Sequence, residues 1–369
     1  MFMVRSSAQY ANMVDVIHTT LSEQSSRRHT VEPIPETMRA SVLLAKGHIE
    51  MQRRPVPHPG PGDVLVKVSS VGICGSDTHY LREGRIGHYV VTEPLILGHE
   101  AAGTIVATGK GVAEARIGER VSIEPQRPDP NTVETRRGDY NLCPHMRFYG
   151  TPPIDGALCE YVTIGSEFAH VVPDAMSDDA AALCEPLSVA IAAARKGGIT
   201  AGSHVLVAGA GPIGIATIQV AAAFGATSLT VTDLDAGRRD LALTFGATTA
   251  LDPRETSLTG LHADVFIDAS GAPAAITSGI EAVRPGGTVV LVGMGAETME
   301  LPVQTIQNRE LNLTGVFRYA HTWPTAIELA ASGRLDLDRM VTATFPLEEA
   351  EAALNADRTP GTIKAVVRL

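Results

Sequence analysis

The chain has 369 residues, of which 44% are hydrophobic and 19% charged, and its formal net charge is -11. This composition predicts a globular protein of about two domains, and its acidic balance provides no basic field for a nucleic-acid backbone. Four cysteines in a chain of this length do not suggest a disulfide framework, and no stretch is long and apolar enough for a membrane helix. We therefore expect reduced thiols, a cytoplasmic location, and neither nucleic acid nor membrane as a partner.

The first 37 residues are polar and show no sustained hydrophobic period. They also lack the continuous apolar core of a secretory signal peptide. We predict a disordered N-terminal extension over residues 1–37, with the folded chain beginning at Met38. Our hypothesis is that Met38 is the natural start or that the extension is dispensable, and the role of the extension stays open at this point.

Residues 38–187 contain a series of short β-rich runs that are broken by glycine and proline. The clearest runs are DVLVKVSSVG, AAGTIVATG, GERVSIEP and GALCEYVTI. Runs of this length, with turn residues at short intervals, are typical of an antiparallel barrel or sandwich. We expect one β-rich domain here, and we expect the tail, residues 316–369, to pack back on it.

The pattern changes from Ser203 onward, where apolar strand runs alternate with helical stretches. Successive strand and helix units of this kind predict a parallel sheet with helices on both faces. Residues 188–315 are therefore predicted to form a doubly wound α/β domain.

A glycine-rich turn marks the start of the first helix of that domain. Gly209, Gly211 and Gly214 directly follow the apolar run 205–208 and open a helix rich in alanine and isoleucine. In this context the glycines permit a tight turn, close approach of a pyrophosphate, and close packing of helix on strand. The helix N-terminus adds N–H donors for the anion, so we predict a dinucleotide site.

Asp233 favours NAD as the cofactor of that site. It ends the second strand, 19 residues after Gly214, where an acid accepts hydrogen bonds from the ribose hydroxyls of NAD and repels the 2′-phosphate of NADP. Arg238 and Arg239 follow closely, and an arginine can accommodate such a phosphate. Strict selectivity for NAD over NADP therefore stays open.

Four side chains ahead of the glycine-rich turn are suited to binding one metal ion: Cys74, His99, Glu100 and Glu185. A thiolate, an imidazole and a carboxylate can hold Zn²⁺ and leave one position open, as in catalytic sites. Taken alone, Cys74 would more often be a small buried hydrophobe, and the His99–Glu100 pair a solvated surface dipeptide. Glu185 adds weight because a carboxylate ahead of an apolar helix needs a partner. It could bind zinc directly or hold a zinc-bound water.

Zinc and NAD together suit the oxidation of an alcohol. The hydroxyl proton must leave before the carbon can release a hydride, and Zn²⁺ lowers the pKa of a bound oxygen by many units. Ser76, close to Cys74, offers a hydroxyl that can relay this proton towards solvent. The predicted catalytic residues are Cys74, Ser76, His99, Glu100 and Glu185.

Over residues 38–369 the chain resembles the zinc-containing medium-chain dehydrogenase/reductase superfamily, and within it the sorbitol (polyol) dehydrogenase branch. The segments that carry the resemblance are GICGSDTHY, GHEAAGTI, GDYNLCP, FYGTPPIDGALCEY, EPLSVAI, GAGPIG, VTDLDAGR and GVFRYAHTWPTAI. The resemblance implies a GroES-like catalytic domain (38–187 and 316–369), a Rossmann NAD-binding domain (188–315) and an active site in the cleft between them. It also implies a homotetramer or a homodimer.

Taken residue by residue, the resemblance implies zinc on Cys74, His99 and Glu100, with Glu185 reaching the metal through water and contacting substrate. The residues implied to line the substrate pocket are Tyr80, Phe148, Glu185, Arg318 and Tyr319. The residues expected around NAD are Gly209, Gly211, Ile213, Gly214, Asp233, Arg238, Val292, Gly293, Met294, Val316, Phe317 and Arg318. Two of these have simpler interpretations, because Phe148 could be plain core and Arg318 a structural ion-pair partner.

Many members of that superfamily carry a second, structural zinc on four cysteines. Counting back from Cys143 at the spacing of the superfamily leads to Thr135, Thr132 and Asp129, so three of the four thiolates are missing. We predict one catalytic zinc per subunit and no structural zinc.

The sequence thus predicts an oxidoreductase that uses zinc to transfer a hydride from a secondary hydroxyl of a polyol, of the sorbitol or xylitol type, to NAD⁺, giving a ketose. Two alternatives remain. One is a sister-branch zinc dehydrogenase that acts on threonine or another secondary alcohol, and the other is a non-catalytic nucleotide-sensing protein on this scaffold. The particular polyol, the carbon that is oxidised and the oligomeric state are left undetermined.

Overall fold

The computed structural model describes residues 33–369, and residues 36–369 form one compact unit. The first strand, β1 (Thr37–Ala45), begins one residue before Met38. The predicted disordered extension over residues 1–37 lies, as far as residue 32, outside the described residues.

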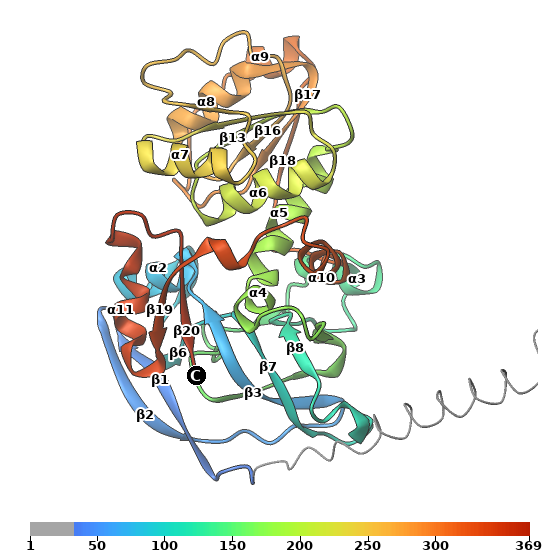
Figure 1. Cartoon of the computed structure of the whole chain (residues 1–369), viewed down its shortest axis with the longest axis vertical. Coiled ribbons are helices and arrows are strands. Elements are labelled where there is room, and N and C mark those ends of the chain that lie inside the picture. Colours follow the sequence, from blue (N-terminus) through green and yellow to red (C-terminus); the bar gives the residue numbers. More distant parts are fainter. Residues whose placement is uncertain (1–32) are drawn as a thin grey trace, which may run out of the picture. The chain divides into compact units, whose positions relative to one another are not determined.

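The β-rich half of the unit is built on a mixed sheet with the strand order β12-β8-β7-β3-β20-β19, in which β11 also pairs with β3. Its strands are β3 (Asp63–Gly72), β7 (Glu100–Thr108), β8 (Arg120–Ile123), β11 (Tyr161–Gly165), β12 (Ala169–Val171), β19 (Val341–Pro346) and β20 (Lys364–Arg368). Strand β20, from the C-terminal tail, pairs with β3 from the start of the chain. The C-terminal tail is therefore joined to the N-terminal part of the chain in one sheet (Figure 1).

Smaller elements complete this half. Strands β2 (His48–Pro55), β1 and β6 (Leu95–Ile96) form a three-stranded sheet. Two short antiparallel pairs are formed by β4 (Arg85–Ile86) with β5 (Tyr89–Val90), and by β9 (Gln126–Arg127) with β10 (Arg147–Phe148). The helices here are α2 (Gly75–Glu83), α3 (Val133–Arg136) and α11 (Ala350–Leu354).

The other half contains a six-stranded parallel sheet with the order β15-β14-β13-β16-β17-β18. Its strands are β13 (His204–Ala208), β14 (Ser228–Thr232), β15 (Thr249–Leu251), β16 (Ala263–Asp268), β17 (Val283–Leu291) and β18 (Asn312–Gly315). Strand β16 is buried over almost its whole length, as expected for a parallel strand that is covered on both faces. In Figure 1, helices α6 (Pro212–Ala223) and α8 (Pro273–Ala282) lie on opposite faces of the sheet.

The strand order reverses beside β13, because β14 follows on one side and β16 lies on the other. Ligands of doubly wound sheets bind at such a point, outside the C-terminal ends of the strands. The glycine-rich turn begins at Gly209, directly after β13. The remaining helices of this half are α7 (Ala236–Thr244) and α9 (Val303–Asn308). The predicted fold class, a β-rich domain with a doubly wound parallel-sheet domain, is confirmed.

Helices α4 (Asp178–Ala182) and α5 (Cys184–Gly197) connect the two halves. Helix α5 packs on α6 and β17 of the parallel half, on β7 of the mixed sheet, and on α10 (Trp323–Ala331). One hydrophobic cluster accordingly contains both Ala102 of β7 and Val207 of β13. The two halves therefore share one hydrophobic core, which fixes the position of the residues on either side of the cleft between them. Among residues 33–369, no helix combines the length and apolar character that crossing a bilayer requires.

Candidate metal centre and substrate cavity

Cys74 stands between β3 and α2, where it occupies the N-cap position of the helix. The thiol is half-buried. Asp77, in the first turn of α2, accepts one hydrogen bond from Cys74 N at 3.1 Å and another, through its second oxygen, from Gly98 N at 2.9 Å. One buried carboxylate therefore connects the cysteine turn to the segment that carries the other candidate ligands.

His99 and Glu100 are neighbours in the sequence and nevertheless face the same point. Gly98 turns the backbone just before them with φ +90°, a conformation that glycine adopts at little cost. Glu100 is the first residue of β7, so the alternation of side chains along a strand does not separate the pair. The candidate ligand atoms of Cys74, His99 and Glu100 all lie within 4.8 Å of one another.

The ring of His99 is oriented by Asp77. Its Nδ1 lies 3.5 Å from Asp77 Oδ1, which leaves Nε2 for a metal, and a carboxylate on the far nitrogen is the usual support of a metal-binding histidine. Burial lowers the pKa of His99, but Asp77 and Cys74 raise it more, so the pKa lies well above its ordinary value. The surroundings therefore favour a positive charge at this point.

Glu100 presents one paired and one unpaired oxygen. Lys364, the first residue of β20, donates from Nζ to Glu100 Oε1 at 2.5 Å and to Ile73 O at 2.8 Å. Glu100 Oε2 is buried and has no hydrogen-bond partner within residues 33–369. Since an unpaired buried oxygen is costly, this atom needs a ligand. The donor set of one sulfur, one imidazole nitrogen and one free carboxylate oxygen fits a zinc ion and leaves a fourth position open.

Glu185 lies outside that group of three. It sits in the first turn of α5, is buried, and accepts a 2.6 Å hydrogen bond at Oε1 from Tyr319 OH. Burial raises the pKa of Glu185, and the charge of Glu100 adds to this effect. Contact of Glu185 with the metal, direct or through water, stays a prediction.

The candidate ligands open into a cavity of about 420 Å³ between the two halves of the unit. Most of the site residues predicted from the sequence line it. They are Cys74, Ser76, Tyr80, His99, Glu100, Phe148, Glu185, Gly211, Ile213, Val292, Gly293, Met294, Val316, Phe317 and Arg318. Tyr319 is not among the lining residues and is connected to the cavity through its hydrogen bond to Glu185.

Arg318 is held at this cavity by aromatic rings. Its guanidinium carbon lies 3.9 Å from the ring centroid of Phe148 and 4.8 Å from that of Phe317. None of the described residues forms a hydrogen bond or ion pair with it. Burial lowers the pKa of Arg318. Its five N–H donors are therefore available to a ligand.

The glycine-rich turn leads from β13 into α6. Gly209 adopts φ +91°, and a Cβ on Gly214 would lie 1.9 Å from Gly209 O. A Cβ on Gly211 would meet nothing within 4 Å, so this position is open to a ligand. Asp233 follows β14, and its carboxylate accepts a hydrogen bond from Ala210 N at 2.8 Å. The acid is thereby fixed beside the turn.

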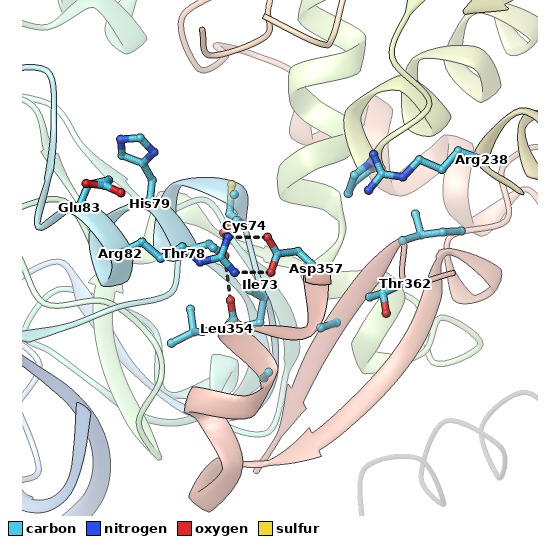
Figure 2. Close-up of a pocket in the computed structure, with 15 residues that line it drawn as sticks. Ile73, Cys74, Thr78, His79, Arg82, Glu83, Arg238, Leu354, Asp357 and Thr362 are labelled. Carbon is cyan, nitrogen blue, oxygen red and sulfur yellow. Dashed lines mark hydrogen bonds and ion pairs between the residues drawn. The ribbon is translucent and has the colours of Figure 1, made fainter. Parts of the chain in front are cut away.

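A second cavity, of about 300 Å³, continues from the first and shares Cys74 and Pro212 with it. Figure 2 shows Arg238 on one side of this cavity and the ion pair of Arg82 with Asp357 on the other. The two cavities together run from the metal-ligand group, past the start of α6, to the exposed Arg238. An extended cofactor would follow the same course.

The four positions considered for a structural metal lie in a lobe formed by residues 128–146. Thr132 caps α3 by accepting a hydrogen bond from the helix backbone, and Cys143 Sγ accepts one from Asp129 N at 3.2 Å. Within residues 33–369, the group in the cleft is the one cluster of three metal-binding side chains. Absence of a second zinc stays a prediction.

Asp77, Tyr89 and Lys364 are among the residues of the site that sequence reasoning overlooked. Tyr89 and Lys364 line the larger cavity. Lys364 lies inside the otherwise apolar run TIKAVV. This position could have indicated a functional residue, because a buried lysine requires a partner. Asp77 had the spacing of an acid that caps the start of a helix.

A candidate zinc centre, a cavity with free hydrogen-bond donors and a dinucleotide turn on a doubly wound sheet define a zinc-dependent oxidoreductase that uses NAD(H). Comparison with known proteins agrees. The chain matches the family models for the alcohol dehydrogenase GroES-like domain over residues 60–174 and for zinc-binding dehydrogenase over residues 212–332. It therefore belongs to the zinc-containing medium-chain dehydrogenase superfamily, and Zn²⁺ and NAD(H) are its cofactors.

Three individual proteins illustrate the relationship. The chain is 41% identical to sorbitol dehydrogenase of Gallus gallus over 339 residues, which cover 89% of this chain and 96% of that protein. It is 44% identical to sorbitol dehydrogenase of Homo sapiens over 319 residues, 84% and 89% of the two chains. The crystal structure of a zinc-binding dehydrogenase from Sinorhizobium meliloti bound to NADP has a TM-score of 0.85 and 31% identity, covering 91% of this chain and 100% of that one. The resemblance predicted from the sequence is confirmed.

Proposed function

We propose that this dehydrogenase oxidises a secondary hydroxyl of a polyol, of the sorbitol or xylitol type, to a ketose and transfers the hydride to NAD⁺. The observation that carries the proposal is the group of Cys74, His99 and Glu100, with its unpaired carboxylate oxygen, at a cavity that also presents the free guanidinium of Arg318. Identity of 41–44% with sorbitol dehydrogenases over most of the chain supports it.

The proton leaves the hydroxyl oxygen and the hydride leaves the carbon that bears it, by different routes. Zinc held by Cys74, His99 and Glu100 supplies Lewis acidity that favours loss of the hydroxyl proton. Ser76 lines the same cavity, and its hydroxyl accepts this proton and passes it towards solvent. Bound NAD⁺ would supply the acceptor for the hydride that the carbon releases.

The remaining hydroxyls of a polyol need partners of their own. Arg318 can donate to two of them through its planar guanidinium, and Tyr80 lines the same cavity. Glu185 is oriented by the hydrogen bond from Tyr319 OH, so its other oxygen can accept from a substrate hydroxyl. A simple secondary alcohol would leave Arg318 without a ligand partner, which is why a polyhydroxylated substrate fits better.

NAD is proposed as the nucleotide because Asp233 is held next to the glycine-rich turn by Ala210 N, where a carboxylate repels a 2′-phosphate. Arg238 lies at the outer end of the second cavity, on the adenosine side of this arrangement. The nicotinamide would lie in the larger cavity, against the backbone of residues 292–294 and 316–317.

A homo-oligomer, either a tetramer or a dimer, and a cytoplasmic location complete the proposal. Within residues 33–369, strand β18 is an edge strand of the parallel sheet that pairs with β17 alone, and the exposed Leu313 lies on it. An open strand edge is a ready surface for pairing with a second copy. Light scattering on the purified protein would show the state directly, and a monomer at micromolar concentration would contradict it.

The test is the appearance of NADH, followed by its near-ultraviolet absorbance, with sorbitol, xylitol, galactitol, ribitol, threonine and 2-propanol. Each substrate is assayed with and without a zinc chelator. Turnover of at least one polyol, abolished by the chelator and restored by zinc, is expected. Turnover of threonine or 2-propanol alone would replace the proposal with a sister activity, and no turnover with any substrate would contradict it.

A further inference from the structure

The segment Phe317–His321 carries two of the proposed substrate residues, Arg318 and Tyr319, and its backbone is strained at two positions. Arg318 has φ +54° and His321 has φ +56°, in the left-handed region that side chains other than glycine rarely adopt. Such conformations persist only where the surroundings determine them. The contacts of this segment therefore identify what places Arg318 and Tyr319 at the cavity.

The lobe of residues 128–146 makes three of these contacts from a stretch of four residues. Asn141 Nδ2 donates to Phe317 O at 2.8 Å. Tyr140 OH accepts a hydrogen bond from His321 N at 2.8 Å, and the ring of His321 reaches Gly138 O at 2.9 Å. The lobe thus engages both ends of the strained segment.

Tyr140 also connects the segment to a buried carboxylate. Its OH donates to Glu124 Oε1 at 2.8 Å, and the same oxygen accepts from Gln126 Nε2 at 3.0 Å. Gln126 Nε2 in turn donates to Tyr319 O at 3.0 Å. Burial raises the pKa of Tyr140, and the charge of Glu124 adds to this, so the hydroxyl stays protonated and keeps its donor role. The segment is therefore held at Phe317, Tyr319 and His321 by one connected network.

We propose that the 128–146 lobe, through Tyr140 and Asn141, positions the Phe317–His321 segment and thereby sets the place of Arg318 in the substrate cavity. Neither Tyr140 nor Asn141 lines the cavity, and both contact backbone atoms of the segment. They are positioning residues for substrate binding. The inference rests on the proposed function, because Arg318 serves the polyol there.

Tyr140→Phe tests the proposal with a minimal change. The ring keeps its edge contact with His321, at 5.0 Å between centroids, while the hydroxyl between His321 N and Glu124 is lost. KM for the best polyol is expected to rise roughly 3- to 10-fold, the effect of one lost hydrogen bond. Zinc content is expected to stay unchanged. Tyr149→Phe is the matched control, because Tyr149 OH donates to Thr163 O, away from the segment.

A double-mutant cycle with Arg318→Ala separates positioning from general destabilisation. If Tyr140 acts through Arg318, then Tyr140→Phe should change KM little once Arg318 is alanine, because coupled residues give non-additive effects. Independent, fully additive effects on KM would overturn the proposal. Adding Tyr149→Phe to Tyr140→Phe or to Arg318→Ala should not restore the wild-type KM.

Hydrogen exchange supplies a readout that does not depend on activity. Amides of residues 316–323 should exchange faster in Tyr140→Phe than in wild type or Tyr149→Phe, since His321 N has lost its acceptor. Unchanged exchange would overturn the proposal, whatever the kinetics. If wild type oxidises no polyol, the proposed function fails, and exchange alone decides whether the lobe holds the segment.

Discussion

Gly72→Ala should weaken zinc binding while leaving the fold intact. Gly72 ends β3, opposite Glu100 in the sheet. A Cβ at this position would lie 2.1 Å from Glu100 Oε2 and 3.2 Å from Glu100 Cβ. The two atoms would have to separate by roughly 1 Å or more to reach an ordinary contact. The added methyl group therefore takes the space of the one carboxylate oxygen that is free to bind metal.

The carboxylate of Glu100 has little freedom to move aside. Lys364 Nζ holds Oε1 at 2.5 Å, and the side chain is fully buried. Loss of a residue that supports a metal ligand lowers metal affinity about 10- to 100-fold, which is roughly 1.4–2.8 kcal/mol of binding free energy. We expect a loss of the same size when the ligand itself is misplaced. Overpacking adds a cost of about 1–3 kcal/mol to the stability of the metal-free protein.

The assay is competition for zinc against a chromophoric chelator, with circular dichroism as a check on folding. Gly75→Ala is the matched control, because it flanks Cys74 on the other side and its Cβ would meet nothing within 4 Å. Its zinc affinity should equal that of wild type. An unchanged affinity in Gly72→Ala, or an equal loss in both variants, would refute the assignment of Glu100 Oε2 as a ligand atom.

Two further outcomes are expected. Metal analysis of the purified protein should give one tightly bound zinc per chain, and two equivalents would mean that the 128–146 lobe binds metal despite its missing thiolates. Cys159 and Cys184 should resist alkylation in the native protein near neutral pH, because burial raises the pKa of each thiol to about 12 and both stay protonated. Labelling of either cysteine before unfolding, read by peptide mass spectrometry, would contradict this reasoning.

Features with a local signal could be predicted from the sequence. The glycines at 209, 211 and 214 stand directly between an apolar strand and an apolar helix, so the turn and the dinucleotide site follow from one short stretch. His99 and Glu100 could be predicted to bind the same metal ion because Gly98 precedes them and permits the backbone turn that this requires. In each case the residues that give the signal are neighbours in the chain.

The groups that support the site have no such signal. Lys364 meets Glu100 across 264 positions of the chain, and Tyr140 meets His321 across 181. Periodicity and turn chemistry act over a few residues, so they say nothing about which strand of the tail will lie beside β3. A lysine in a buried run predicts an acidic partner. Which acid that is depends on the order of the strands in the sheet.

Glu100 shows the same limit. The sequence predicts that it is a metal ligand but does not predict which of its two oxygens is free to bind the metal. As a residue type, glutamate offers two equivalent oxygens to a metal. In the folded protein Lys364 takes Oε1, Gly72 leaves just enough space for Oε2, and the buried carboxylate cannot exchange them. The choice between the two oxygens arises from strands β3, β7 and β20 meeting in one sheet. Ligand chemistry is therefore local in the sequence, whereas ligand orientation, on which affinity depends, is tertiary.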